Sequence, residues 1–336
     1  MLPAMKKILL FFSFFLLACA AQTPTPPPVP GFDADLSAYS YPFPVSFHTF
    51  EAQAQSLRMA YMNLPAKSGA PVIVLLHGKN FGGFYFAALA ERLQKMGYRV
   101  FIPDQIGFGK STKPKQFQYS FQALATFTDQ LLEKEGITNY TLLGHSMGGM
   151  LATRMALLFP EKVKKLILVN PIGLEDWKTL VPYRPVDQVY RSELQSNAAS
   201  IKKYQSEAYY SGGWDPAYDE LIKPAVGWTL HSDYPLVAWN SALTFDMIFT
   251  QPVFYEFKNV KVPTALLIGQ KDKTALGKAW ASPAAQKSMG NYPVLGRQAA
   301  RLIPRAKLYA LEGLGHVPFI ENLDRFMKEA MEPALR

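Results

Sequence analysis

Ser146 has the sequence surroundings of an activated nucleophile. It is the central residue of Gly144-His145-Ser146-Met147-Gly148, between an apolar run that ends at Leu143 and a helical pattern that begins at Met147. In so sharp a strand-to-helix turn the serine backbone is strained, and side chains at the two glycines would collide across it. The hydroxyl then projects from the carboxyl edge of the sheet, and the backbone N–H of Met147 faces the place where an oxyanion would form. The pattern predicts attack by Ser146 on an acyl carbon.

A serine hydroxyl at its ordinary pKa is a weak nucleophile and needs a neighbouring base. His316 is the best candidate among the five histidines, because it follows the last predicted strand in a loop that contains Gly313 and Gly315. Such a loop at the carboxyl edge of the sheet suits a general base. The other four histidines are placed elsewhere: His145 within the serine turn, His77 after the third strand, His48 in an edge strand and His231 in an insertion.

The base needs an acidic partner that orients the imidazole and stabilises its cation. Asp272 follows the penultimate strand at the same edge of the sheet, and we expect it to fill this role. Asp104 is a rival because it also ends a strand, but it lies in a glycine-rich turn where an aspartate commonly caps backbone N–H groups. Glu175 and Asp176, after the sixth strand, are more remote alternatives.

Eight short apolar runs could position these residues at one sheet edge. They cover residues 45–50, 57–62, 72–76, 99–102, 140–143, 165–169, 264–268 and 306–310. Helical patterns over 84–96, 121–134, 147–159 and 323–331 alternate with them. This alternation predicts an α/β fold with a mostly parallel, eight-stranded sheet and helices on both faces.

The alternation stops between residues 171 and 257, which are helix-leaning and rich in aromatic residues, so we interpret them as an insertion in one domain. Four of the five tryptophans lie there, and the fifth, Trp280, follows Asp272. Rings gathered over a catalytic edge indicate an apolar pocket, although they could equally form a small core of the insertion itself.

The order Ser146…Asp272…His316, the serine turn, His77-Gly78 and the turn Pro103–Ser111 together resemble the α/β-hydrolase family over about residues 43–336. By that resemblance the core comprises 43–170 and 258–336, and 171–257 is a helical cap. The resemblance also implies a second oxyanion donor after His77-Gly78. We assign it to the backbone N–H of Lys79, with Asn80 as the alternative.

The sequence departs from the family pattern in two places, and the second departure argues against two activities. The stretch from Asp272 to His316 is longer than usual, which predicts an added loop over about 276–292. Residues 79–83 match neither the prolyl aminopeptidase motif nor that of carbon–carbon bond hydrolases. A serine nucleophile also argues against haloalkane dehalogenases and epoxide hydrolases.

We therefore expect a serine hydrolase that cleaves small carboxylic esters of apolar character through an acyl-enzyme. Amide or peptide hydrolysis, carbon–carbon cleavage and perhydrolysis use the same three residues and remain alternatives. A binding lipoprotein that reuses the fold without catalysis is a further alternative. No metal or organic cofactor is implied.

Residues 1–21 have the anatomy of an export signal. Lys6 and Lys7 precede an apolar run of ten residues, which is followed by the small residues 18–21. Leu16-Leu17-Ala18-Cys19 resembles a bacterial lipobox, in which Cys19 would be lipidated; the alternative is ordinary cleavage after Ala18-Cys19-Ala20. Residues 22–42 begin with a proline-rich stretch and are predicted to be a linker. We expect an exported protein, periplasmic or held at the outer membrane by a lipid, with secretion as the alternative.

Composition excludes several other classes. The single cysteine rules out an internal disulfide, a zinc finger and an iron–sulfur site. The formal charge is +9, but no Lys/Arg cluster exceeds two adjacent residues, so no nucleic-acid-binding surface is predicted.

Overall fold

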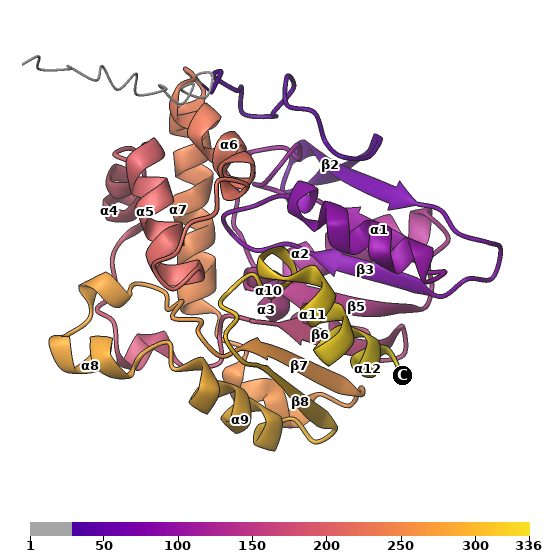
Figure 1. Ribbon diagram of the computed structural model, residues 1–336. Coiled ribbons are helices and arrows are strands. Elements are labelled where there is room, and N and C mark those ends of the chain that lie inside the picture. The colour runs from indigo at the N-terminus through magenta and orange to yellow at the C-terminus, as the bar shows by residue number, and fades with distance from the viewer. Residues whose placement is uncertain (1–28) are drawn as a thin grey trace, which may run out of the picture.

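The computed structural model describes residues 29–336 (Figure 1). The predicted export signal, Cys19 and the first part of the linker lie outside the described residues. Within the described part of the chain, no helix is long and apolar enough to cross a membrane.

An eight-stranded sheet forms the centre of the molecule, as predicted. Its strands are β1 (Val45–Ala52), β2 (Gln55–Leu64), β3 (Val72–Leu76), β4 (Arg99–Pro103), β5 (Tyr140–His145), β6 (Val163–Val169), β7 (Thr264–Gly269) and β8 (Ala306–Leu311). The spatial order is β1-β2-β4-β3-β5-β6-β7-β8. β1 pairs with β2, and β2 with β4, in antiparallel fashion, while all other pairs are parallel. The predicted strand ends are correct to within two residues.

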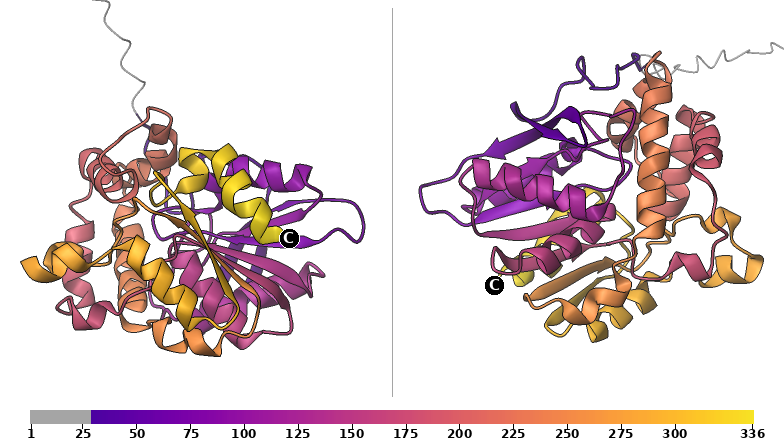
Figure 2. Two further views of the ribbon diagram at one scale, coloured as in Figure 1. Left: turned by 60° about the horizontal axis from the view of Figure 1, so that its bottom comes forward. Right: turned by 180° about the vertical axis from the view of Figure 1, so that it is seen from behind.

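The central strands carry apolar side chains on both faces, so helices cover both faces of the sheet. Leu142 of β5 points into one apolar core and Leu143 into the other, as period-two alternation requires. α2 (Phe121–Lys134), α3 (Met147–Leu158) and α9 (Tyr292–Leu302) pack on the first face. Figure 2, in its right view, shows α2 and α3 in front of the strands.

The second face is covered by helices from the two ends of the domain. A 3-10 turn, η1 (Gly83–Phe86), leads into α1 (Ala87–Lys95). The chain ends in α10 (Pro318–Glu321), α11 (Leu323–Phe326), a π-helical turn η5 (Met327–Met331) and α12 (Glu332–Leu335). Phe86 and Phe319 stack between these two groups, which closes this core.

The insertion between β6 and β7 is helical, as predicted. Its elements are η2 (Trp177–Thr179), α4 (Val186–Glu193), α5 (Ala198–Tyr209), α6 (Tyr218–Thr229), α7 (Tyr234–Thr250) and η3 (Phe254–Asn259). Helices α4 to α7 stand together at one end of the sheet and form a cap (Figure 1). The longer stretch after Asp272 contains η4 (Lys278–Trp280) and α8 (Pro283–Ser288), which project as an added loop.

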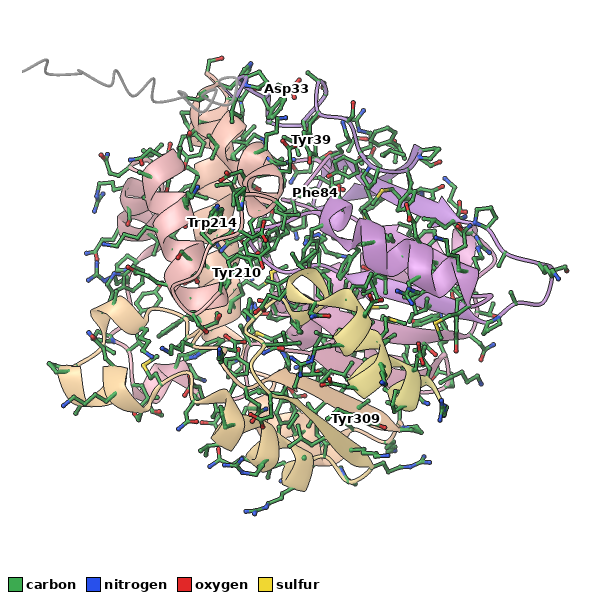
Figure 3. All side chains as sticks on the ribbon, in the orientation of Figure 1. Asp33, Tyr39, Phe84, Tyr210, Trp214 and Tyr309 are labelled. Atoms are coloured by element: carbon green, nitrogen blue, oxygen red, sulfur yellow. The ribbon has the colours of Figure 1, made fainter. Side chains whose placement is uncertain are left out.

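The predicted linker must be corrected, because its last part belongs to the folded domain. Residues 31–42, here called the strap, run from the cap to the core. Figure 3 labels Asp33 and Tyr39 of the strap, and the Tyr39 ring packs on that of Phe84 in the core. Phe32 and Leu36 are buried. The Phe32 N–H donates to Gly227 O of α6, and the Tyr41 hydroxyl donates to Asp104 of the core. The sequence analysis missed these buried residues because a proline-rich stretch precedes them and the whole segment was interpreted as a linker.

Candidate active site

Ser146 occupies the sharp turn between β5 and α3. Its φ of 56° and ψ of −122° are unusual for a residue with a side chain, and such strain is often found at functional sites. A Cβ at Gly144 would overlap the carbonyl oxygen of Gly148, and one at Gly148 would overlap that of Leu76. The turn therefore requires both glycines for packing, as predicted. Ser146 is only 5% exposed beneath the cap.

His316 and Asp272 meet at the same edge of the sheet. Asp272 follows β7, and His316 follows β8 in a loop that ends at α10. The His316 Nδ1–H donates to Asp272 Oδ2 over 2.6 Å, and both side chains are fully buried. Within residues 29–336, His316 Nε2 has no hydrogen-bond partner, and no bond joins it to Ser146. The ring of His145, which precedes Ser146, lies 4.8 Å from the His316 ring between centroids.

Asn170 holds the Asp272 carboxylate and was missed by sequence reasoning. Its side-chain amide donates to Asp272 Oδ2 over 2.8 Å, and its Oδ1 accepts the N–H of Gly269 over 2.9 Å. The N–H of Thr274 donates to Asp272 Oδ1 over 2.8 Å. Asp272 thus accepts hydrogen bonds from three donors. The position of Asn170, directly after β6 at the sheet edge, was the available signal.

Asp104 is fully engaged elsewhere. Its carboxylate accepts hydrogen bonds from the Tyr41 hydroxyl (2.6 Å) and from the N–H groups of Gly83 (2.6 Å) and Lys110 (2.8 Å). The interpretation of Asp104 as a cap of backbone N–H groups is confirmed.

The two remote alternatives to Asp272 also have other partners. Glu175 accepts the Gly290 N–H over 3.0 Å, and burial raises the pKa of its carboxyl group. Asp176 caps η2 through the N–H of Lys178. Both residues therefore support the loops around the site.

His145 and His77 have structural hydrogen bonds. The His145 Nε2–H donates to His316 O over 2.8 Å, and its Nδ1 accepts the Tyr85 hydroxyl over 2.7 Å. Burial holds the pKa of His145 well below its usual range, so the ring is neutral. His77 Nε2 accepts the N–H of Gln105 over 3.0 Å. Both nitrogens of His145 are engaged, which leaves none for proton transfer to Ser146.

The two candidate oxyanion donors flank Ser146. Met147 is the first residue of α3, and Lys79 follows Gly78, whose backbone passes close to the serine. Neither N–H has a hydrogen-bond acceptor in the described part of the chain. The Gly78 N–H donates to Tyr85 OH over 3.1 Å, and Gly78 O accepts the N–H of Phe81. These bonds fix the loop that carries Lys79.

Side chains of the oxyanion loop reach into the cap. The Lys79 ammonium group donates to Ser241 Oγ of α7 over 2.6 Å and lies 3.6 Å from Glu193 of α4. Asn80 donates to the hydroxyl of Tyr209 at the end of α5 over 2.7 Å. The cap therefore presents polar groups to this side of the site, which the sequence did not predict.

The tryptophans contact parts of the core, the cap and the strap. Trp177 is part of the main core, and Trp214 packs on Tyr210 and Tyr218 within the cap. The indole N–H groups of Trp228 and Trp239 donate to Asp33 O and Lys115 O. Trp280 packs on Phe245. These contacts agree with the alternative that the rings belong to the structure of the cap and its borders.

Among residues 29–336, no group of three or more His, Cys, Asp or Glu side chains is arranged to hold a metal ion.

Known proteins with similar sequences and structures support this description. A probable hydrolytic enzyme from Pseudomonas aeruginosa PAO1 is 47% identical, covers 92% of this chain and 99% of its own, and superposes with a TM-score of 0.90. Lipase 1 from Psychrobacter immobilis is 28% identical over 80% of this chain and 77% of the lipase. Lipase 3 from Moraxella sp. TA144 is 26% identical over 79% of this chain and 77% of that lipase.

The family comparison covers most of the folded region. The sequence model of the α/β-hydrolase fold matches residues 71–323, which include Ser146, Asp272 and His316. Together with the eight-stranded sheet and its order, this match means that the chain belongs to the α/β-hydrolase family.

Proposed function

We propose that the protein hydrolyses carboxylic esters through an acyl-enzyme formed on Ser146. His316 Nε2 removes the Ser146 proton as Oγ attacks the ester carbonyl carbon, and the same proton then passes to the leaving alcohol. Water, deprotonated by His316, attacks the acyl-enzyme and releases the acid. The observation that carries this proposal is the buried 2.6 Å hydrogen bond between His316 and Asp272, which leaves Nε2 without another partner.

Asp272 keeps His316 in the tautomer that the reaction needs. Because Nδ1–H donates to the carboxylate, the lone pair of a neutral imidazole lies on Nε2. The Asn170 amide and the Thr274 N–H fix the carboxylate and hence the plane of the ring. As His316 gains a proton, the buried negative charge stabilises the imidazolium.

The N–H groups of Met147 and Lys79 are proposed to bind the oxyanion of the tetrahedral intermediate. Both are without acceptors in the described chain, and the N-terminus of α3 adds a favourable dipole for negative charge. Asn80 is less suited to this role because its side chain is already bonded to Tyr209.

We propose small esters with apolar acyl or alcohol groups as substrates. Support comes from the two similar proteins named lipases.

A panel of p-nitrophenyl esters, with matched anilides, tests the reaction. We expect a burst of nitrophenol, and labelling of Ser146 by a fluorophosphonate that Ser146→Ala abolishes. Asp272→Asn should lower kcat by about three to four orders of magnitude while the protein remains folded. Equal rates in the wild type and Ser146→Ala would refute the mechanism, and faster cleavage of the anilides would favour an amidase.

We further propose that Cys19 is lipidated and attaches the exported protein to a membrane surface. The motif Leu16-Leu17-Ala18-Cys19 supports this proposal. The full chain, expressed in a bacterium fed an alkyne-labelled fatty acid, should incorporate the label, and Cys19→Ser should not. A mature chain that begins after Ala20 and carries no label would instead establish ordinary signal cleavage.

A further inference from the structure

The cap contacts the proposed catalytic base directly at the end of α5. Tyr209, the last residue of that helix, accepts the backbone N–H of His316 on its carbonyl oxygen over 2.9 Å. Its ring stacks on the His316 imidazole with 4.5 Å between centroids and 30° between planes. Tyr209 is 4% exposed. One residue of the cap therefore holds both the backbone and the ring of His316.

The same side chain reaches the oxyanion loop. The Tyr209 hydroxyl accepts a hydrogen bond from Asn80, the residue that follows Lys79. Burial raises the pKa of this hydroxyl well above its usual range, so it stays neutral beside the base. Tyr209 thus connects the two loops that lie on either side of Ser146.

The close approach of Tyr209 depends on a glycine in the histidine loop. A Cβ at Gly315 would overlap the Tyr209 carbonyl oxygen. The Gly315 N–H donates to the Glu321 carboxylate over 2.9 Å, which holds this part of the loop against α10. Two residues after Tyr209, Ser211 Oγ donates to the carbonyl of Lys271, the residue before Asp272. The end of α5 is therefore bonded to the loops of both proposed triad partners.

We propose that Tyr209 is a positioning residue for the reaction, which sets the orientation of His316 and of the oxyanion loop and stabilises the imidazolium with its π face. This proposal rests on the function proposed above. An aromatic face within about 6 Å of a cation attracts it, and the attraction is strongest where water is excluded. The ring at 4.5 Å is in this range and acts only when His316 carries its second proton.

Three variants separate the contributions of Tyr209. Tyr209→Phe keeps the ring but loses the hydroxyl, Asn80→Ala removes the other partner of the same hydrogen bond, and Tyr209→Leu removes the ring but keeps an apolar cover. Tyr210→Leu is the matched control, because Tyr210 lies next in the chain and is similarly buried, but it stacks on Tyr218. All four are compared with the wild type in kcat, KM and melting temperature.

Tyr209→Leu should lower kcat by about tenfold with little change in KM, and shift the acid limb of the kcat/KM profile down by about half a pH unit. Tyr209→Phe should restore the wild-type limb. A smaller loss of kcat is expected for Asn80→Ala and for Tyr209→Phe. The variant that combines these two substitutions should show the same loss, because all three remove the same hydrogen bond.

The remaining groups near His316 do not differ between these variants. They are Asp272, His145, Tyr292 and Glu321. If Tyr209→Leu and Tyr210→Leu have the same kcat and the same pH profile, the proposal is overturned, because the loss then reflects packing alone. Fluorophosphonate labelling of the wild type separates the two proposals: no label at Ser146 refutes the proposed function, whereas a labelled, active wild type with an unaffected Tyr209→Leu refutes only the role of Tyr209.

Discussion

Replacing Asn170 tests how firmly Asp272 must be held. The Asn170 amide donates to Asp272 and its Oδ1 accepts the Gly269 N–H, in a fully buried position. Its backbone lies in the left-handed region, with φ of 39°. Asn170→Gly removes these two hydrogen bonds and a longer one from the Asn170 amide to Gly269 O (3.4 Å). It leaves the backbone conformation accessible, because glycine adopts positive φ without a steric penalty.

The hydrogen bonds of Asn170 set the size of the expected decreases in the free energy of unfolding and in kcat. A hydrogen bond to a charged acceptor contributes about 1.5–3 kcal/mol, and a buried N–H without a partner costs about 1–3 kcal/mol. Asn170→Gly should therefore lower the free energy of unfolding by about 2.5–6 kcal/mol. Asn170→Ala should lose about 1 kcal/mol more, because alanine disfavours positive φ. If the bond to Asp272 is needed in the transition state, kcat falls by about tenfold to hundredfold.

Ester hydrolysis and urea unfolding of the same preparations measure these two effects. Asn240→Ala is the control, since Asn240 is also buried with two hydrogen bonds, to the Tyr119 hydroxyl (2.6 Å) and Leu236 O (2.9 Å), but does not contact Asp272. We expect it to lose stability, with a smaller loss of kcat per folded molecule than Asn170→Gly. Wild-type kcat in folded Asn170→Gly, or an equal loss in Asn240→Ala, would refute the reasoning.

Three further predictions concern the fold. Gly148→Ala should melt earlier and resist fluorophosphonate labelling, because its Cβ overlaps Leu76 O; normal labelling would show that the turn can relax. A chain starting at residue 29 should melt higher by calorimetry than one starting at residue 43, which lacks the buried Phe32 and Leu36; equal melting temperatures would contradict a stabilising strap. Burial lowers the pKa of Lys113 to about 8 in the folded protein. Between about pH 8 and 10.5 the unfolded chain therefore binds more protons than the folded protein, and the free energy of unfolding should rise with pH across that window. Lys113→Met should remove this rise in urea titrations, and an unchanged pH dependence would argue against it.

The serine turn and the strand order could be predicted because their constraints are local. Ser146 needs glycines at two fixed positions, and each parallel strand needs a continuous apolar run with a helix after it. Since parallel strands end at one edge, Asp272 and His316 could be placed near Ser146 without knowing any contact between them. The bond between Asp272 and His316 agrees with the expectation that Asp272 orients the imidazole.

Contacts between the cap and the core could not be predicted in the same way. Tyr209 is one of several tyrosines in a helical pattern, and nothing local distinguishes it from Tyr210, which faces Tyr218. The tryptophans were conspicuous by type, but their neighbours are other parts of the cap and the core. Which aromatic ring reaches a site depends on how α5 docks, and that is decided by contacts far apart in the sequence.

The place of the cap in the chain explains why it can influence the chemistry. It is inserted between β6 and β7, so Asn170 stands at its entry and β7, which leads to Asp272, follows its exit. On the far side of Ser146, Lys79 is bonded to Ser241 of α7. A change in how the cap docks must therefore move the support of Asp272 and the oxyanion loop together. Exchanging this cap for that of a relative should then alter kcat as well as substrate preference, whereas a cap that only covered the site would alter preference and KM alone.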